Sequence, residues 1–454
     1  MTYNGGNLIK WGLKPGPWFK AAIQKANDLH DQGHIEEDIK DLIEMDQPVY
    51  LEMRDPAEDK MVPFSVFLEP ENDIEEVNAI AVMKAMKDIM RVPVVTGGAI
   101  MPDACPAGTI PVGGVVVSSG IHPNYHSADL CCSMAITILD SDHDPKSMLD
   151  KIQELTHFGP TKRDNRPVEL PENFTEDFGE NQFLQGLEDV ARWHFTTQGD
   201  GNHFYYVGHI ESTGQMAIVS HHGSRGFGSR VYKRGKTAAE KHTQTVAPSV
   251  PKAHSWLGFD TKEGQQYWRA LQVVREWTRL NHFMLHNEIV RQMNGKIADQ
   301  YWNPHNFVFM RDNMFHHAKG ATPSYDFHSH DDMGRTLIPM NMAEPILITT
   351  HANNEHAHGF APHGAGRNMS RTQFLKENNP DQPQDIDVRF WCGLEDKSEL
   401  PEAYKSAAQV TDAIKENGLA NIVDRVMPYG SIMAGDWEQD APWRAQMDRD
   451  MKRR

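Results

Sequence analysis

The stretch HGAGRNMSR at residues 363–371 combines a histidine with two glycines, two arginines and a serine. Glycines allow backbone N–H groups to come close to an anion. Arg367 and Arg371 lie four residues apart, and guanidinium groups bind phosphate oxygens in a bidentate manner. An imidazole in such a setting, here His363, is placed for nucleophilic attack on phosphorus. The alternative interpretation is a glycine turn in a loop whose arginines serve solubility.

Histidine recurs in several other short polar strings of this chain, which contains 24 histidines in 454 residues. The strings are HSADLCC (126–132), GDGNHF (199–204), SHHGSRGFG (220–228) and NPHNFV (303–308). Each histidine on its own also fits a hydrogen-bonded structural role. The glycine and asparagine residues of the last three strings, however, suit tight loops at strand ends better than a core.

The residue types in these strings are typical metal ligands. Asp129 and Cys132 fall at positions i and i+3 of the first string, so both can face one site. The single histidines His203, His221 and His305, from distant segments, would complete one or two coordination shells. Thiolate with imidazole favours a soft or borderline divalent ion, and the carboxylate points to manganese or zinc rather than magnesium.

These strings, in this order, resemble those of the RtcB family of RNA ligases. The resemblance extends from residue 101 to the C-terminus and also includes MPDACPAGTIPVGG (101–114), DTKEGQQYWRAL (260–271), AKGAT (318–322) and PEAYKSAAQV (401–410). It implies an α+β fold of RtcB type, with central antiparallel or mixed β-sheets flanked by helices. A single catalytic domain would cover residues 96–454. Residues 1–95 would hold an N-terminal extension and the start of that domain.

The resemblance also implies an activity. RtcB enzymes join an RNA 3′-phosphate or 2′,3′-cyclic phosphate to a 5′-hydroxyl, in RNA repair or tRNA splicing, with GTP and two manganese ions. The nucleophilic histidine of the family corresponds to His363, which would form a histidine–GMP intermediate. The manganese ligands of the family, with Cys132 as the bridge between the two ions, correspond to Asp129, Cys132, His203, His221 and His305.

Contacts to the nucleotide and the RNA carry over in the same way. The positions expected near the nucleotide phosphates are Asn202, Asn306, Gly364, Ala365, Gly366 and Arg367. The positions expected to read the base are Tyr206, Asn341 and Met433. The positions expected to bind the RNA substrate are Asp103, Arg225 and Arg371.

The three base-reading positions depart from the family together. Tyr206 stands where the family has a glutamate, Asn341 where it has a serine, and Met433 where it has a lysine. A carboxylate that accepts from two guanine donors discriminates sharply between bases, so its loss puts the preference for GTP in doubt. The expected nucleotide is therefore GTP or another nucleoside triphosphate.

Two other functions stay open at this point. The chain fits an RtcB paralogue with altered nucleotide preference that activates or repairs RNA ends outside tRNA splicing. It also fits a non-catalytic, metal-stabilised protein that binds RNA ends. Because His363 and the ligand positions are all present, the sequence favours an enzyme.

Composition limits the surroundings in which the protein works. The formal net charge of −18 excludes a sequence-independent nucleic-acid binder, although an enzyme that grips only an RNA end can be acidic overall. Four cysteines are too few for a disulfide scaffold, which fits a reducing cytoplasm. Without a signal-peptide core or an apolar run of membrane length, we expect no membrane partner. The expected partners are RNA ends and an archease-like activator, and the expected assembly is a monomer or weak oligomer.

Apolar spacing indicates where the regular elements lie. It predicts helices over 18–30, 33–46, 75–91, 264–293 and 401–418, and strands over 112–120 and 133–140. The helix over 264–293 is either one long helix or a broken pair, with a core stripe of Tyr267, Leu271, Val274, Trp277, Leu280 and Phe283. Asp129 and Cys132 would lie at the start of the second strand. We expect loop positions for His351, His356 and His358, and a frayed tail over 448–454.

Overall fold

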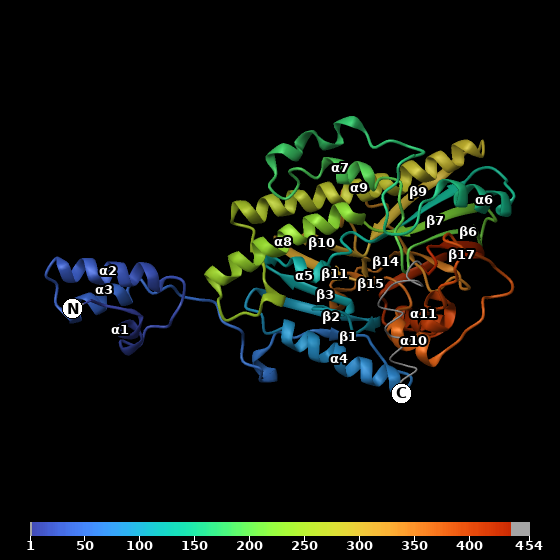
Figure 1. Cartoon of the computed structure of the whole chain (residues 1–454). Coiled ribbons are helices and arrows are strands. Elements are labelled where there is room, and N and C mark those ends of the chain that lie inside the picture. Colours follow the sequence, from blue (N-terminus) through green and yellow to red (C-terminus); the bar gives the residue numbers. More distant parts are fainter. Residues whose placement is uncertain (1, 437–454) are drawn as a thin grey trace, which may run out of the picture.

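The computed structural model describes residues 2–436 of the chain, so the expected tail over 448–454 lies outside the described residues. Figure 1 shows a small helical lobe near the N-terminus, joined to a larger body by an extended segment. The lobe consists of α1 (Gly5–Lys10), α2 (Phe19–Asp31) and α3 (Glu36–Glu44), which confirms the two helices predicted there. It has a hydrophobic core of its own, which includes Leu8, Ala26, Ile39 and Ile43.

The first part of the body is a five-stranded sheet. Its strand order is β1 (Ser65–Val66), β2 (Val95–Cys105), β3 (Val112–Ser118), β11 (Met314–Lys319) and β10 (Asn306–Arg311). The helix predicted over 75–91 is α4 (Asp73–Ile89). It begins at Asn72, whose side chain accepts a hydrogen bond from the backbone N–H of Glu75. Its apolar face packs with side chains of β2 and β3 in one hydrophobic cluster.

An eight-stranded sheet forms the other half of the body. Its main path is β13 (Arg335–Ile338), β14 (Ile346–His351), β17 (Ala420–Met433), β6 (Phe204–Ile210), β7 (Met216–His222), β5 (Ser133–Leu139) and β9 (Ile297–Pro304), with β16 (Asp387–Phe390) beside β17. The sheet curves strongly, so that β13 and β9, at the two ends of this path, approach each other. Asn303 of β9 accepts from the N–H of Leu337 on β13 (2.9 Å) and donates to the carbonyl of Leu337 (3.2 Å).

The inner strand β5, between β7 and β9, is buried on both faces, which explains its mostly apolar sequence. Met134, Ile136 and Ile138 point into a cluster with β6, β7, β14 and β17. On the other face, the Thr137 hydroxyl lies 2.8 Å from Nδ1 of His286 on α9 (Lys262–Gln292). The strands predicted over 112–120 and 133–140 are therefore confirmed as β3 and β5.

Two long helices cover the region between the sheets, as Figure 1 shows for α8 (Arg225–Val246) and α9. α9 is one continuous helix of 31 residues, which settles the choice between a long helix and a broken pair. Its N-terminus is capped by Thr261, whose hydroxyl accepts from the N–H of Gly264. Of the predicted core stripe, Tyr267, Leu271, Val274 and Trp277 are fully buried, and Leu280 and Phe283 are partly buried against the same cluster.

The segment 401–418 differs from its prediction as one helix. Residues 401–403 form a short 3-10 turn, and the helix itself, α11 (Ala407–Glu416), begins only after Ser406. Ser406 accepts from the N–H of Gln409, a cap that fixes the helix start at this point. Just before it, the Lys405 ammonium donates to the carbonyls of Pro102 (3.1 Å) and Ala104 (3.0 Å), which holds the chain extended across β2.

Short elements complete the fold. The paired strands are β4 (Gly120–Ile121) with β8 (Leu257–Gly258), and β12 (Ala321–Pro323) with β15 (Phe360–Pro362). The remaining helices are α5 (Pro123–His126), α6 (Pro145–Leu155), α7 (Glu188–Trp193) and α10 (Arg371–Glu377). The architecture is thus the expected α+β arrangement of mostly antiparallel sheets flanked by helices. Within residues 2–436, every helix is too short or too polar to cross a lipid bilayer.

The burial of Trp277 generates a test of the role of α9. Its indole N–H donates to the carbonyl of Ala191 (3.0 Å), and its ring packs against Phe195 and Phe227. Trp277→Ala should lower the free energy of unfolding by about 3–5 kcal/mol, since it leaves a large cavity. Trp193→Ala, at a side chain that is 42% exposed, should cost less than about 1 kcal/mol. Urea titrations followed by far-UV circular dichroism check both values, and similar midpoints for the two variants would contradict this account.

Candidate functional site

Four neighbouring strands of the eight-stranded sheet bring the predicted ligands together. Cys132 directly precedes β5, His203 directly precedes β6, and His305 directly follows β9. His221, near the end of β7, is paired with Phe204 of β6 on one side and Met134 of β5 on the other. In an antiparallel sheet the start of one strand lies beside the end of the next. The four side chains therefore gather at one edge of the sheet.

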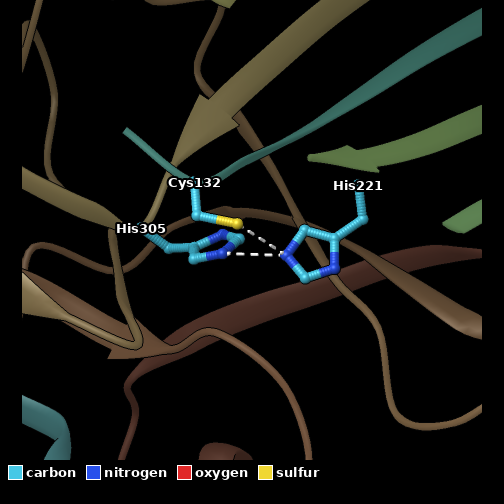
Figure 2. A group of neighbouring side chains, drawn as sticks. All are labelled: Cys132, His221 and His305. Atoms are coloured by element: carbon cyan, nitrogen blue, oxygen red, sulfur yellow. Dashed lines mark hydrogen bonds between the residues drawn. The ribbon is translucent and has the colours of Figure 1, made fainter. Parts of the chain in front are cut away.

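The side chains at this edge form two groups that share one sulfur. His221 Nε2 lies 3.1 Å from Cys132 Sγ and 3.1 Å from His305 Nε2, and Figure 2 shows both contacts as dashed lines. On its other side, Cys132 Sγ lies 3.5 Å from His203 Nε2, which is 3.9 Å from Asp129 Oδ1. Both groups, Cys132–His221–His305 and Asp129–Cys132–His203, have the proximity needed to hold a metal ion. Cys132 belongs to both, as expected for a bridging ligand.

Backbone carbonyls orient two of the imidazoles toward this edge. His203 Nδ1 lies 2.6 Å from the carbonyl of Gln198, and His221 Nδ1 lies 3.0 Å from the carbonyl of Asn202. Because a carbonyl only accepts hydrogen bonds, the proton of each neutral ring sits on Nδ1. The lone pair of Nε2 then points at the cluster, which is the arrangement usual for histidine ligands of metals.

Burial sets the protonation of the cluster. Burial, together with the neighbouring imidazoles, lowers the pKa of both His221 and His305, so these rings are neutral and able to act as ligands. Burial, followed by the Asp129 carboxylate, raises the pKa of the Cys132 thiol. Since only the thiolate binds a metal well, uptake of a divalent ion here must release the thiol proton.

His363 lies directly beside the cluster. Its ring centroid is 5.0 Å from that of His305, and its Nδ1 lies 2.6 Å from Asp103 Oδ2. Asp103, expected in contact with the RNA substrate, is instead fully buried, and its carboxylate contacts His363. This contact places the proton of the neutral imidazole on Nδ1 and leaves Nε2 with its lone pair, which is the nucleophilic form. Gly320 is needed here, because a Cβ would lie 3.0 Å from the His363 ring at a φ of +63°.

Asn306 connects the cluster to the loop that carries His363. Its side-chain nitrogen donates to Asp129 Oδ2 (3.1 Å), and its side-chain oxygen accepts from the N–H of Gly320 (2.7 Å). Gly320 in turn accepts from the N–H of His363 through its carbonyl (3.4 Å). The Asn306 side chain is therefore held between Asp129 of the cluster and Gly320, which bonds to His363.

A cavity of ≈ 240 Å³, here called the central pocket, opens beside His363. Its wall contains most of the residues expected at a nucleotide, namely Asn202, Tyr206, Asn341, His363, Gly364, Ala365, Gly366, Arg367 and Met433. Phe204, Met340, Met342 and Ile346 form an apolar part of the same wall. The three departures from the RtcB pattern therefore lie in one wall rather than scattered through the fold.

At two of these three positions, the side chain already forms a hydrogen bond within the protein. The Tyr206 hydroxyl donates to the carbonyl of Val426 (2.9 Å), and Asn341 Oδ1 accepts from the N–H of Ala343 (2.9 Å). Met433 is packed against Met342 and Leu400. Ser431, which the sequence analysis missed, also lines the pocket, and its buried hydroxyl has no hydrogen-bond partner among the described residues. Ser431 is visible only through the pairing of β17 with β6, where it lies opposite Tyr206.

Glu399 is a second residue to which the sequence patterns did not point, and it lies beside the two arginines of the 363–371 stretch. Arg371 Nη2 lies 2.6 Å from Glu399 Oε1, and Arg367 Nη1 lies 3.5 Å from Glu399 Oε2. Both Nη atoms of Arg367 are buried and form no hydrogen bond within residues 2–436. Arg367 thus lines the central pocket with a guanidinium group that forms no hydrogen bond through its Nη atoms, and Glu399 lies beside both guanidinium groups.

A second pocket, of ≈ 610 Å³, lies on the Asp129 side of the cluster. Arg225, Arg230 and Arg371 line it, and Asn202 and Arg371 border both this pocket and the central pocket. Arg225 is held in place by hydrogen bonds to the carbonyl of Gly159 (2.8 Å) and the hydroxyl of Thr197 (3.2 Å). The cluster and His363 therefore lie between two cavities, and each cavity is lined by arginines that were predicted to bind the nucleotide or the RNA.

Comparison with known proteins gives one family match and several similar proteins. The model of a protein family described as tRNA-splicing ligase RtcB matches residues 161–434. The chain is 26% identical over 292 residues to the tRNA-splicing ligase RtcB of Archaeoglobus fulgidus, over 53% of this chain and 60% of the relative. It is 26% identical over 281 residues to the tRNA-splicing ligase RtcB of Thermococcus kodakarensis, over 51% of this chain and 58% of the relative.

A bacterial relative gives a similar result. The chain is 25% identical over 274 residues to the RNA-splicing ligase RtcB of Mycobacterium tuberculosis, over 52% of this chain and 63% of the relative. The chain thus spans about three fifths of the length of the curated relatives it matches.

The shared sulfur generates a test of the cluster. Cys132→Ser should weaken binding of a divalent cation at least about 10-fold, because the one substitution removes a ligand from both groups. His356→Ala, at an exposed position, should bind as the unaltered chain does. Manganese retained after gel filtration, measured by plasma mass spectrometry, compares the two. Equal loss of metal from both variants would show that the ions bind elsewhere.

Proposed function

The chain belongs to the RtcB family, and we propose that it is an RNA ligase that joins an RNA 3′-phosphate or 2′,3′-cyclic phosphate to a 5′-hydroxyl. The observation that carries the proposal is the position of His363 between a pair of ligand groups and an apolar pocket. The names of the relatives, tRNA-splicing or RNA-splicing ligase, support it.

The proposed reaction has three steps. His363 Nε2 attacks the α-phosphorus of a nucleoside triphosphate, so that a P–N bond forms and pyrophosphate leaves. The nucleotidyl group then passes from the imidazole to the RNA 3′-phosphate, and the P–N bond breaks. Finally the 5′-hydroxyl attacks the activated 3′-phosphate, releases the nucleoside monophosphate and loses its proton. A 2′,3′-cyclic phosphate enters the sequence after one water opens the ring.

Two manganese ions fit the residues of the cluster. The donors are one thiolate, three imidazoles and one carboxylate, a set that suits a borderline divalent ion, and Cys132 would serve both ions. When bound, such ions neutralise phosphate charge and support displacement at phosphorus. In this proposal Asp103 is a positioning residue, because it fixes the tautomer of His363 from a fully buried place.

The arginines are proposed to bind phosphates on the two sides of His363. Arg367, with its unused donors, faces the central pocket and would hold the triphosphate. Arg225 and Arg371 line the second pocket, where the RNA end would lie. This division agrees with the acidic net charge, since only the end of the RNA has to be gripped.

The central pocket also favours a paralogue with altered nucleotide preference as the second candidate function. Tyr206 offers the base an aromatic surface, while its hydroxyl is already bonded to Val426. Met433 offers no charged donor. A site of this kind holds a purine by apolar contact and has few groups that distinguish guanine from adenine.

The intermediate can be tested directly. The protein, with manganese, is incubated with each of the four α-labelled nucleoside triphosphates, and protein-bound label that is acid-labile and base-stable is measured. We expect label on the unaltered chain and on His356→Ala, and none on His363→Ala. Because a phosphoramidate needs the imidazole, label that persists without His363 would place the nucleophile at another residue. Absence of label with all four nucleotides would argue against the proposed reaction.

Competition between GTP and ATP in the same labelling reaction tests the base. Loss of a bidentate carboxylate contact removes roughly 2–4 kcal/mol of discrimination, which corresponds to about 30- to 1000-fold. We therefore expect GTP to be favoured over ATP much less than a glutamate-containing site would favour it. Exclusive labelling by GTP would show that other groups, such as the Ser431 hydroxyl, replace the missing contact.

A further inference from the structure

A third group of ligand-type side chains lies outside the site described above. His328 and Asp332 belong to the loop between β12 and β13, and His351 is the last residue of β14. His351, predicted as a loop residue, is thus a strand residue, opposite Ala420 at the start of β17. Strand β17 has 14 residues, and Met433 of the central pocket lies at its other end. At about 3.3 Å a residue, the two ends lie roughly 40 Å apart along the strand.

The three side chains are buried together. His328, Asp332 and His351 have side chains that are 3%, 7% and 2% exposed. Nδ1 of His328 and Nε2 of His351 form no hydrogen bond to any part of the described chain. Buried polar atoms nearly always have a partner, so two unpartnered imidazole nitrogens beside one carboxylate require an explanation.

The spacing of the three groups is that of ligands around one ion. Asp332 Oδ2 lies 3.5 Å from His328 Nδ1, and Asp332 Oδ1 lies 3.6 Å from His351 Nε2. One ligand atom from each residue falls within 4.8 Å of the other two. Two atoms bound to a tetrahedral zinc at about 2.0–2.1 Å are themselves about 3.3 Å apart. The observed separations are too long for good hydrogen bonds but close to this value.

The surrounding contacts fix the ligands in the required form. His351 Nδ1 lies 3.1 Å from Asp326 Oδ1, and Asp326 Oδ2 accepts from the Asn353 side chain (3.2 Å). A carboxylate behind a histidine in this way is typical of metal sites, because it leaves the other nitrogen unprotonated. Asp332 itself is oriented by the N–H groups of Phe327 (2.9 Å) and Gly334 (2.8 Å).

The neighbouring Asp331 shows that an ordinary ion pair looks different in the same loop. Asp331 is bound by the Arg275 guanidinium, by the indole N–H of Trp302 (2.8 Å) and by the hydroxyl of Ser329 (2.8 Å). Asp331 thus accepts hydrogen bonds from three different donors, and the Arg279 guanidinium lies a further 3.8 Å from its Oδ2. Asp332, one residue later, faces two histidine nitrogens at longer distances, so a second ion pair does not account for it.

We propose that His328, Asp332 and His351 bind one divalent metal ion of the zinc class, separate from the cluster around Cys132. Two imidazoles and one carboxylate are suitable ligands for zinc, and a water molecule would complete four-coordination. The ion fastens the loop between β12 and β13 to the end of β14. From that loop β13 leads directly to Met340 and Asn341 in the wall of the central pocket.

The test uses the full chain with the substitutions Cys132→Ser and His305→Ala, which together disable both ligand groups of the first cluster. In this background we expect one equivalent of zinc to bind, measured by competition with a chromophoric chelator. Adding His328→Ala or Asp332→Asn should abolish that binding. Adding His330→Ala should preserve it, since His330 is an exposed histidine in the same loop and is a matched control. Equal zinc binding by the His328→Ala and His330→Ala chains would overturn the proposal.

Cobalt provides a readout that needs no further substitution. In the Cys132→Ser, His305→Ala chain, one equivalent of Co²⁺ should give the visible absorption of a tetrahedral or five-coordinate site, without the intense thiolate charge-transfer band. Zinc should displace this spectrum and raise the melting temperature, because a ligand that binds only the folded state stabilises it. Absence of both the spectrum and the melting shift would overturn the proposal.

Discussion

The alternating direction of β6, β7, β5 and β9 is the constraint on which the rest of the site depends. It brings four ligand side chains, from segments far apart in the sequence, to one edge of one sheet. Because β5 lies between β7 and β9, Cys132 stands between His221 and His305, and its sulfur also reaches His203 at the start of β6, so it belongs to two groups. The same edge carries Asn306, which ties the cluster to the loop of His363. His221 lies within β7, while Cys132, His203 and His305 directly flank strand ends, so the register of the strands decides which of these four side chains meet.

Short strings of the sequence were sufficient to predict which residues meet at this edge. The ligand types and the glycine-rich nucleophile stretch are local signals, and the fold places them together. Glu399, Ser431 and the direction of Asp103 were not predictable, because each depends on a contact across many residues. Glu399 reaches Arg371 through the packing of a 3-10 turn, and Ser431 reaches the pocket through the β6–β17 register. The segment 401–418 was misjudged for a similar reason, since Lys405 is held extended by carbonyls of β2.

In the function proposed above, phosphate binding and the choice of base belong to different parts of the fold. In that proposal, phosphates would be bound by the ligand edge, the 363–371 stretch and Arg225, which have buried polar partners. The base would lie against the end of β17 and residues 339–342, where apolar side chains dominate. Polar networks tolerate little change, because each lost partner leaves another buried group unsatisfied. Apolar walls accept substitutions of similar volume.

The self-contained core of the N-terminal lobe has an evolutionary consequence. Tyr3, Leu8, Leu13, Ala22, Ala26, Ile39 and Ile43 form that core, and every one belongs to the first 43 residues. The sheets and long helices of the body keep all of their own buried side chains whether or not these residues are present. A module of this kind can be acquired, exchanged or lost by gene fusion without any compensating change in the body. Its sequence is therefore free to diverge at a different pace from that of the strands that hold the cluster.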